Sequence, residues 1–355
     1  MLDELRREID GIDDKIIELL IERTKNVKQV GHLKRSSNET VYRPEREKAI
    51  IDRLYGNQKK EGILTRAAIE AIFLEIFAVS RNYELPERVA YLGPEGSFTH
   101  QAAESRYGGL SAYLPLDSIH SVFDAVATGR ARFGVVPIEN NQEGTVQETI
   151  DYLDVHELNI VAEIVLPIHL CFASLEDDLK KIKTLYSKDI AFRQCKKFLI
   201  DYFDHAVRQV PISSTSRACK IAVEEPRSAA ICAPIAARQN RLPILYTNIQ
   251  DSAHNQTRFL ILGKNFINKI SHEDKTSIIA KLSDKPGALV TLLKRFEEAN
   301  VNLCKVESRP AKIGSKFAYI FFIEFDGHFH TAAVQKAVSR YADNITWLGS
   351  YVKTC

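Results

Sequence analysis

The feature that most constrains the fold of this chain is the helical period of its first 35 residues. Apolar side chains recur every three or four positions and form one stripe, and the run contains no proline. The stripe comprises Leu2, Leu5, Ile9, Ile12, Ile16, Leu19, Leu20, Val27 and Val30. A helix of this kind cannot bury its stripe within a small segment, so we expect an all-helical domain that dimerises.

The pattern predicts two further helices and then changes at Pro86. A break at residues 36–38 precedes a short helix after Pro44, and a third helix is expected over 65–82. These elements make a helical domain of residues 1–86. Beyond it, short apolar strands alternate with helical stretches, which is typical of an α/β domain, here 87–264.

In the last segment, residues 274–355, the predicted strands and helices follow a different order. Strands are predicted over 277–282, 301–306, 317–325 and 345–352, and helices over 287–300 and 331–342. This order, βαββαβ, is the ferredoxin-like α+β arrangement. The chain is therefore expected to be multidomain, as its length of 355 residues also requires.

Composition excludes several classes of protein. The net charge is +2 and the pI is about 8.1, so nucleic acid is not expected as a partner. No two of the six cysteines form a C-x-x-C motif, which favours buried free thiols over a zinc site or disulfides. The most apolar run, 160–173, is interrupted by Glu163, Pro167 and His169, and the N-terminus lacks a signal-peptide core. We predict a cytoplasmic protein with no membrane partner.

Two polar motifs stand at predicted strand ends in the α/β segment. Glu139 and Asn140 follow an apolar strand, and Thr257 and Arg258 precede another. Open α/β sheets bind small molecules at strand ends. Because neither motif has metal-ligand spacing, a glycine-rich phosphate loop or a nucleophile–base pair, they indicate a site that binds an anion and moves a proton.

Charged residues also stand among the apolar positions of the predicted helices: Arg6, Arg23, Lys34, Arg46, Glu47 and Glu84. A solvated charged face is the ordinary explanation for any one of them. Arg6 and Arg23, however, lie 17 positions apart, about 25 Å along a straight helix, so one small substrate cannot touch both within one chain. An antiparallel partner helix would bring a second Arg6 beside Arg23.

This layout resembles the all-helical type of chorismate mutase. The matching stretches are Leu5-Arg6, Asp13-Asp14-Lys15, Leu19-Leu20, Glu22-Arg23, Val30-Gly31-His32-Leu33-Lys34 and Arg46-Glu47. The resemblance implies that Arg6 of one subunit and Arg23 and Arg46 of the other hold the substrate carboxylates. Lys34 and Glu84 would hydrogen-bond the ether oxygen, and Glu47 the substrate hydroxyl, with Ser80 on the same helical face as Glu84.

The rearrangement of chorismate needs a compact conformer and stabilised charge, not proton transfer. Glu84 can donate to the ether oxygen only when it is protonated, so mutase activity is expected to fall as pH rises. Arg43 stands where some family members carry an acid, which leaves the contacts of the substrate hydroxyl open.

The α/β segment resembles prephenate dehydratase from about Val89 to Gly263. The matching stretches are Gly93-Pro94-Glu95-Gly96-Ser97-Phe98, Pro137-Ile138-Glu139-Asn140 with Gly144, Tyr186-Ser187, Gln194-Cys195, Ser213-Ser214-Thr215 and Asn255-Gln256-Thr257-Arg258-Phe259. The resemblance implies two lobes around a cleft, as in periplasmic binding proteins, with chain crossings near Lys183 and Tyr246.

The same resemblance implies roles in a reaction that expels carbon dioxide and hydroxide and leaves an aromatic ring. Thr257 would donate to the departing hydroxide, and Arg258 would bind a carboxylate bidentately. Further predicted substrate contacts are Ser97, Glu139, Asn140, Ser187, Gln194, Ser213, Ser214, Thr215 and Phe259.

Some of these residues have ordinary structural explanations. Ser213 to Thr215 precede a helical stretch and are typical of an N-cap, and both uses are compatible. Cys195 is expected in the core, because no histidine with a matching role is evident. Asn141 and Lys188 depart from the residues that are frequent in the family.

The last segment resembles the ACT domain, a small amino-acid-sensing module. The match is carried by Asp284-Lys285-Pro286-Gly287-Ala288-Leu289 and Glu307-Ser308-Arg309-Pro310. Free backbone N–H groups at a helix N-terminus attract a carboxylate, although Pro-Gly before a helix is also common in loops. The implied effector is L-phenylalanine, bound by Gly287, Ala288, Leu289, Val290, Glu307, Ser308, Arg309 and Pro310, with Glu307 and Ser308 expected to complete the pocket across a dimer interface.

Together the three resemblances identify the chain as a member of the bifunctional chorismate mutase/prephenate dehydratase family with an ACT domain. The expected partners are chorismate, prephenate, L-phenylalanine and a second copy of the chain, with no cofactor or metal. One alternative is a dehydratase whose helical segment serves only dimerisation. Another is a non-catalytic amino-acid sensor, although the N-terminal helices lack the short turn and basic recognition helix of a DNA-binding motif.

Overall fold

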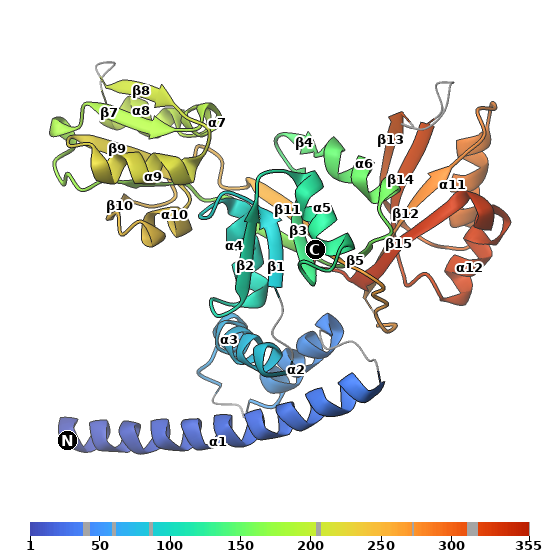
Figure 1. Ribbon diagram of the computed structural model, residues 1–355, viewed down its shortest axis with the longest axis horizontal. Helices are drawn as coiled ribbons and strands as arrows, with labels where there is room; N and C mark the ends of the chain where they lie inside the picture. Colours follow the sequence, from blue (N-terminus) through green and yellow to red (C-terminus); the bar gives the residue numbers. More distant parts are fainter. Residues whose placement is uncertain are drawn as a thin grey trace. The chain divides into compact units, whose positions relative to one another are not determined.

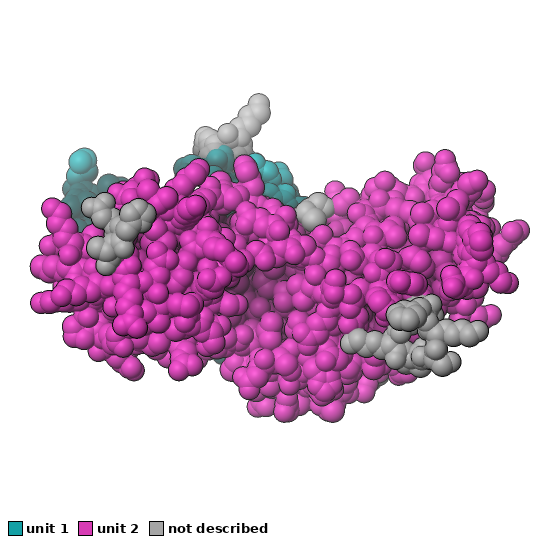
Figure 2. All heavy atoms as spheres, turned by 90° about the horizontal axis from the view of Figure 1, so that it is seen from above, with its two compact units in different colours: residues 1–87, 107–112 teal, residues 88–106, 113–355 magenta. Residues whose placement is uncertain are grey.

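The computed structural model describes residues 1–37, 43–58, 62–84, 88–203, 207–271, 273–310 and 319–354, without the side chains of residues 34–37. The chain forms two compact units (Figure 2), Met1–Glu87 with Tyr107–Ala112, and Arg88–Arg106 with Tyr113–Cys355. No helix in the described ranges is long and apolar enough to cross a membrane.

The first unit contains the three predicted helices, α1 (Leu2–Ser37), α2 (Pro44–Gly56) and α3 (Arg66–Glu84). Helix α3 packs on both others, with Ile51, Ile69 and Phe77 in the core. Where α1 crosses α3, Gly31 is required: a Cβ there would lie 3.1 Å from the Cα of Glu84.

Along the N-terminal half of α1, the described residues of one chain leave the apolar stripe uncovered. The helix has 36 residues, so it is about 54 Å long at 1.5 Å per residue (Figure 1). Along its N-terminal half, Leu5, Ile9, Ile12 and Ile16 are between 48% and 55% exposed. An apolar face of this length is typical of a helix that packs against a partner.

The second unit begins with lobe 1, a six-stranded sheet in the order β2-β1-β3-β11-β5, with β4 paired to β3. Its strands are β1 (Arg88–Leu92), β2 (Ala112–Leu116), β3 (Phe133–Asn140), β4 (Gly144–Thr145), β5 (Asn159–Pro167) and β11 (Gln256–Gly263). Its helices are α4 (Phe98–Tyr107), α5 (Ile119–Ala127) and α6 (Gln147–Val155). Strand β1 is parallel to β3, whereas β11 runs antiparallel to both β3 and β5.

Lobe 2 is a five-stranded sheet in the order β10-β6-β9-β7-β8. Its strands are β6 (Cys171–Ala173), β7 (Thr184–Ser187), β8 (Arg208–Pro211), β9 (Ser228–Cys232) and β10 (Ile244–Tyr246). Its helices are η1 (Leu179–Lys181), α7 (Asp189–Gln194), α8 (Lys196–Tyr202), α9 (Thr215–Glu224) and α10 (Pro234–Gln239).

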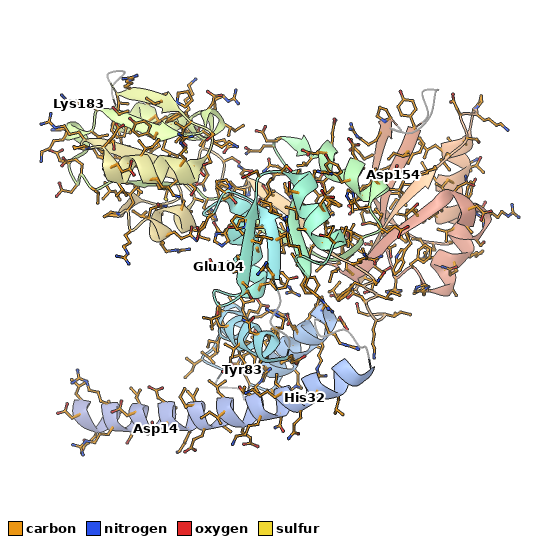
Figure 3. All side chains as sticks on the ribbon, in the orientation of Figure 1. Asp14, His32, Tyr83, Glu104, Asp154 and Lys183 are labelled. Atoms are coloured by element: carbon orange, nitrogen blue, oxygen red, sulfur yellow. The ribbon has the colours of Figure 1, made fainter. Side chains whose placement is uncertain are left out.

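The first chain crossing between the lobes corrects the prediction made near Lys183. The chain leaves sheet one at Pro167, the end of β5, and enters sheet two at Cys171. Lys183 lies inside lobe 2, directly before β7 (Figure 3). The apolar run continues through the crossing, so hydrophobicity alone did not reveal the change of sheet. The second crossing follows Tyr246, as predicted.

The C-terminal segment has the predicted βαββαβ order. Its elements are β12 (Asp274–Lys281), α11 (Ala288–Glu298), β13 (Leu303–Pro310), β14 (Tyr319–Asp326), α12 (Ala332–Val338), η2 (Ser339–Asn344) and β15 (Ile345–Val352). They form a four-stranded antiparallel sheet in the order β13-β14-β12-β15.

Both faces of this C-terminal sheet are covered, as the alternation of side chains along β12 shows. Ile278 belongs to a core with Leu292 of α11 and Val334 of α12. The next residue, Ile279, belongs to a core that includes Ile138 and other residues of lobe 1. The sheet therefore lies between its own helices and lobe 1, and its second face is not free to solvent (Figure 1).

Candidate active sites

In lobe 1, the Thr257 and Asn140 side chains meet because β11 and β3 pair in that register. Asn140 Nδ2 donates to Thr257 Oγ1 at 2.8 Å, to Asn255 Oδ1 at 2.9 Å and to the carbonyl of Gln256 at 3.1 Å. The backbone N–H groups of residues 142 and 143 donate to Asn140 Oδ1 at 2.9 and 3.0 Å. These two donors fix which side of the Asn140 amide is oxygen.

This fixed amide decides what the Thr257 hydroxyl can do. An NH₂ group only donates, so Thr257 Oγ1 must accept from it and its own hydrogen is left to donate. A hydroxyl that accepts a hydrogen bond becomes a stronger donor. No other hydrogen bond of this hydroxyl is found among the residues that the structure describes. The hydrogen of the Thr257 hydroxyl is thus available to donate a hydrogen bond.

Arg258 lies on the other face of β11 and does not share this site, because successive side chains on a strand point to opposite faces. Its terminal nitrogens donate to Glu324 at 2.9 and 2.7 Å, to Glu163 at 3.2 Å and to Glu139 at 3.0 Å. The bidentate carboxylate predicted for Arg258 therefore belongs to the protein. The roles predicted for Arg258, as the ligand of a substrate carboxylate, and for Glu139, as a lining residue of the same site, stay predictions, and the intramolecular pairing of Arg258 does not support them.

The opposite charges around Arg258 stabilise one another in their ionised forms. Burial acts to lower the pKa of Arg258, but the charges of Glu324 and Glu163 outweigh it and keep the pKa above its usual value. For Glu139, burial acts to raise the pKa, but Lys305 and Arg258 outweigh it and the pKa is lowered. Both groups are therefore held in their charged forms.

Lobe 1 also contacts lobe 2 near the glycine-rich loop after β1. Ser216 donates to the carbonyl of Glu95, and His100 Nδ1 lies 3.2 Å from Gln239 Nε2. Gly96, with a φ of 77°, leaves no room for a Cβ, which would lie 2.8 Å from Ser216 Oγ. The predicted Ser97 hydroxyl donates to the Leu92 carbonyl at 3.1 Å and caps α4.

Sequence reasoning missed His100, Ser216, Gln239 and Asn255. His100 is buried, is stacked on Tyr91 at 4.7 Å, and has a pKa that burial lowers. Asn255 could have been found, because it stands in the same motif as Thr257. The other three carry no pattern in the sequence that indicates contact between the lobes.

The predicted substrate residues of lobe 2 have structural partners. Ser187 is fully buried and its hydroxyl donates to the Ile231 carbonyl at 2.6 Å. Ser214 caps α9 by accepting from the Arg217 N–H at 3.1 Å, which confirms the capping prediction. Thr215 opens the same helix and is buried, Ser213 is exposed, and the Gln194 carbonyl accepts from the Asp251 N–H.

Two further predicted positions are in the core. Phe259 is 1% exposed within β11, so its ring is part of the core, and its predicted contact with substrate stays a prediction. Cys195 is fully buried, and burial raises the pKa of its thiol to about 12. The expectation that Cys195 is a core residue is confirmed. Asn141, a departure from the family pattern, extends the β3–β11 pairing by bonding to the backbone of Gln256 at 3.1 Å in both directions.

In the helical unit, α3 gathers several of the predicted mutase residues. Arg23 of α1 donates to Ser80, and Arg81 pairs with Glu47 of α2. Partial burial lowers the pKa of Arg23, while the charges of Glu84 and Glu47 oppose this effect. Arg81 was not predicted, although it directly follows Ser80 in the sequence.

Arg6, Arg46 and Lys34 stand apart from this group. Arg6 is exposed near the start of α1, where Asp3 lies 3.5 Å away. Arg46 is exposed on α2. Lys34 is in α1, but its side chain lies outside the described residues. One chain thus brings together Arg23, Glu47, Ser80 and Glu84, and leaves Arg6 about 25 Å from Arg23 along the helix.

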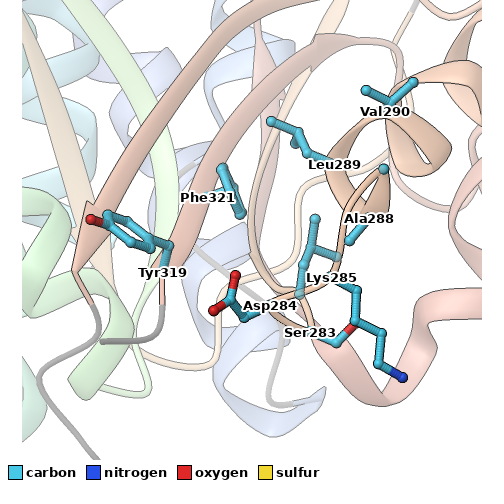
Figure 4. A pocket seen from close by; sticks show the side chains of 10 residues that line it. Ser283, Asp284, Lys285, Ala288, Leu289, Val290, Tyr319 and Phe321 are labelled. Atoms are coloured by element: carbon cyan, nitrogen blue, oxygen red, sulfur yellow. The ribbon is translucent and has the colours of Figure 1, made fainter. Parts of the chain in front are cut away.

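A cavity of about 170 Å³ opens at the N-terminus of α11 (Figure 4). Gly287, Ala288, Leu289 and Val290, all predicted effector residues, line it from the helix. Gly287 has a φ of 81°, which favours glycine. The loop Leu282–Lys285 and two aromatic side chains of β14, Tyr319 and Phe321, complete the lining.

The second effector motif lies elsewhere within one chain. Glu307 accepts from Thr145 at 3.1 Å, and Arg309 binds Asp151 bidentately at 3.0 and 3.1 Å, both partners being in lobe 1. The neighbouring Ser308 and Pro310 are exposed on the other face of β13. The structure therefore does not bring Glu307 and Arg309 to the cavity.

One group of possible metal ligands exists in the described part of the chain: His120, Asp124 and His156, on α5 and after α6. His120 Nε2 and His156 Nε2 lie 3.5 and 3.3 Å from the carboxylate of Asp124. None of the three is a predicted site residue.

The fold and these sites define a class: a multidomain enzyme in which a helical unit with a cationic site is joined to a two-lobed α/β domain. The chorismate mutase type II family matches residues 5–85, and the prephenate dehydratase family matches residues 89–266. The chain belongs to the family of bifunctional chorismate mutase/prephenate dehydratases, and it is an enzyme with both activities.

Similar proteins cover nearly all of the chain. The bifunctional enzyme of Aquifex aeolicus is 39% identical over 357 residues, spanning 99% of this chain and 98% of the relative. That of Pseudomonas aeruginosa is 36% identical, with the same coverage. The prephenate dehydratase of Arthrobacter aurescens, solved in complex with L-Phe, is 31% identical with a TM-score of 0.68, over 75% of this chain and 90% of that one. The match to residues 5–85 favours a mutase over a helical segment that only dimerises.

Proposed function

We propose that Thr257 is the proton donor of the dehydratase reaction and that Asn140 orients it. Loss of carbon dioxide from prephenate breaks a C–C bond, and its electron pair enters the ring. The ring expels hydroxide, which takes the Thr257 proton and leaves as water, and solvent water then returns a proton to the Thr257 oxygen and releases hydroxide. The observation that carries this role is the Asn140 Nδ2–Thr257 Oγ1 hydrogen bond of 2.8 Å. The amide oxygen of Asn140 is held by the backbone N–H groups of residues 142 and 143.

A coupled assay separates the two activities. With chorismate as substrate, Thr257→Ala is expected to accumulate prephenate, whereas Lys34→Ala is expected to leave chorismate unconsumed. With prephenate as substrate, Lys34→Ala forms phenylpyruvate at the wild-type rate. Phenylpyruvate formation by Thr257→Ala at the wild-type rate would contradict the role of Thr257.

We also propose that the mutase site is shared between two subunits of a homodimer. The proposed substrate ligands Arg23, Glu47, Ser80 and Glu84 gather in one chain, while Arg6 lies about 25 Å away along α1. An antiparallel partner helix would both cover the exposed stripe of α1 and supply Arg6. Arg46 and Lys34 would complete the set, as the family resemblance implies.

Subunit complementation tests this arrangement. Arg6→Ala and Arg23→Ala should each be inactive as mutases. When equal amounts of the two variants are unfolded together and refolded, half of the dimers are mixed and each has one intact site, so about one quarter of the wild-type activity returns. If each chain held a complete site, mixing would restore nothing.

For the C-terminal segment, we propose an ACT domain that binds L-phenylalanine and inhibits the dehydratase. The backbone N–H groups at the start of α11 would hold the amino-acid carboxylate, and Tyr319 and Phe321 would contact its ring. The related enzyme solved with L-Phe supports this choice of effector. Residues 1–86, 87–264 and 274–355 would then be three modules.

The structure favours a point variant over truncation as the test. Deleting residues 274–355 would expose the core that Ile279 and Phe322 share with lobe 1. Ala288→Leu instead fills part of the cavity and leaves that core intact. It should raise the phenylalanine concentration for half inhibition about tenfold or more, equivalent to 1.4 kcal/mol or more of binding. Unchanged inhibition would place the effector elsewhere.

A further inference from the structure

A largely buried cluster of six alternating charges joins β11 of lobe 1 to the C-terminal sheet. Lobe 1 supplies Arg258 of β11, Glu139 of β3 and Glu163 of β5, and the C-terminal sheet supplies Lys275, Lys305 and Glu324. The three positive and three negative charges balance. The cluster has no role in the functions proposed so far.

Arg258 is the centre of the cluster. Its bidentate contact with Glu324 is the shortest, with Nη2 2.7 Å from Oε2 and Nη1 2.9 Å from Oε1. The Arg258 side chain is 10% exposed and that of Glu324 2%. Ser277 and Tyr351 also donate to Glu324, each at 3.1 Å, so the carboxylate is held in one position.

The second buried carboxylate, Glu163, is equally well held. Lys275 Nζ lies 2.9 Å from both of its oxygens, and the backbone N–H of Thr354 donates to it at 3.1 Å. Buried ion pairs are poor sources of stability compared with apolar packing, but they enforce one geometry strictly. A cluster of this kind therefore fixes the position of Arg258 more than it stabilises the fold.

The position of Arg258 bears directly on the dehydratase site. In the pairing of β3 with β11, Arg258 stands opposite Glu139, and the next pair is Thr257 opposite Asn140. The first pair points to the C-terminal sheet, and the second pair forms the proposed proton donor and its orienting amide. Because the pairs are adjacent in both strands, a displacement of the first moves the backbone of the second.

The other end of the cluster reaches the effector cavity through β14. This strand carries Tyr319 and Phe321, which line the cavity, and Glu324, which binds Arg258. Phe322, between them, is fully buried in the core shared with lobe 1. A single strand thus contacts both the cavity and the guanidinium next to Thr257.

We infer that Arg258 is a positioning residue for Thr257, and that the Glu324–Arg258 contact transmits the state of the effector cavity to the dehydratase site. This inference rests on the roles proposed above for Thr257 and for the cavity. It differs from a substrate-binding role, because Arg258 acts through the backbone of β11 and touches no substrate.

The test is Glu324→Gln, which keeps the shape of the side chain and removes its charge. With prephenate as substrate, kcat is expected to fall about tenfold or more while KM changes less than about twofold, because the geometry of the donor changes and the contacts of the substrate do not. Inhibition by phenylalanine should weaken in the same variant. Arg258→Lys, which keeps the charge and loses the bidentate contact, should reproduce both effects.

Asp151→Asn is the matched control. It removes the charge from another bidentate pair between lobe 1 and the C-terminal sheet, Asp151 of α6 with Arg309 of β13, neither of which belongs to β11. This variant should keep the wild-type kcat for prephenate. Thermal unfolding of all variants, followed by circular dichroism, shows that the rates are compared in folded protein.

Several results would overturn the inference. Wild-type kcat and wild-type inhibition in Glu324→Gln would show that the Glu324–Arg258 contact does not couple the two sites. A loss of kcat in Asp151→Asn equal to that in Glu324→Gln would show that loosened packing in general lowers the rate. A rise in KM at constant kcat in Arg258→Lys would mean that Arg258 binds substrate directly. If Thr257→Val is inactive and Glu324→Gln has normal activity, Thr257 stays the proposed donor and only the inference about Arg258 fails. If Thr257→Val is fully active, Thr257 is not the proton donor.

Discussion

Replacement of Thr257 by valine is the most direct test of the dehydratase site. Valine keeps the branched shape and loses the oxygen, so the departing hydroxide loses its proposed proton donor. General acid catalysis contributes about 10²–10⁴-fold to a rate, which corresponds to about 2.7–5.4 kcal/mol at 1.36 kcal/mol per tenfold. We therefore expect kcat for phenylpyruvate formation from prephenate to fall by about three orders of magnitude.

The structural cost of this substitution is small by comparison. Asn140 Nδ2 has two hydrogens and three acceptors within 3.1 Å, so without Thr257 Oγ1 it keeps Asn255 Oδ1 and the Gln256 carbonyl. The loss of one half-buried hydrogen bond costs about 1 kcal/mol of the free energy of unfolding, or about 2–4 °C in Tm. Catalysis and folding are thus affected on different scales.

The chain supplies its own controls for the assay. Consumption of chorismate by the helical unit reports the amount of active protein in the same sample, and Thr257→Ser, which keeps the hydroxyl, should retain most of the dehydratase activity. A valine variant that keeps about one tenth or more of the wild-type kcat would refute the reasoning, since general acid catalysis would then supply less than its usual share.

Two further predictions concern stability. For Glu163, burial acts to raise the pKa, but Lys275, the Thr354 N–H and Arg258 outweigh it, so the pKa is lowered and its stabilisation is lost as pH falls below about 4.3. In urea titrations, Glu163→Gln should be less stable than wild type at pH 7, and the difference should shrink steadily as the pH falls below about 4.3; a constant difference would contradict this. Gly349→Ala places a Cβ 2.2 Å from the Ile160 carbonyl and should cost about 3 kcal/mol or more. Gly327→Ala has a positive φ of 103° but no atom within 3.4 Å, so it should cost only about 1–2 kcal/mol, and equal losses would exclude the steric explanation.

Much of the architecture was predictable because it depends on local patterns. The 3.6-residue period of the first segment predicted three helices, and the structure has them at Leu2–Ser37, Pro44–Gly56 and Arg66–Glu84. The βαββαβ order of the last segment followed from the same reasoning and is confirmed. The Ser214 cap and the buried Cys195 were also predicted from local context.

The first crossing between the lobes was not predictable in this way. An apolar run has the same appearance whether a strand stays in one sheet or the chain enters the next, and only pairing partners distinguish the two. Strand β6 pairs with β9 and β10 of lobe 2, not with β5, which directly precedes it.

The sequence by itself determined that Thr257, Arg258, Glu139 and Asn140 stand at strand ends. Only the tertiary structure decided which of them can meet a ligand. Alternation along a strand turns Thr257 and Arg258 to opposite faces, but it does not say which face is covered. Glu324, 66 residues further along the chain, covers the face on which Arg258 lies and pairs with its guanidinium. The residues next to Arg258 in the sequence do not reveal this partner, because Glu324 lies on a strand of a different sheet.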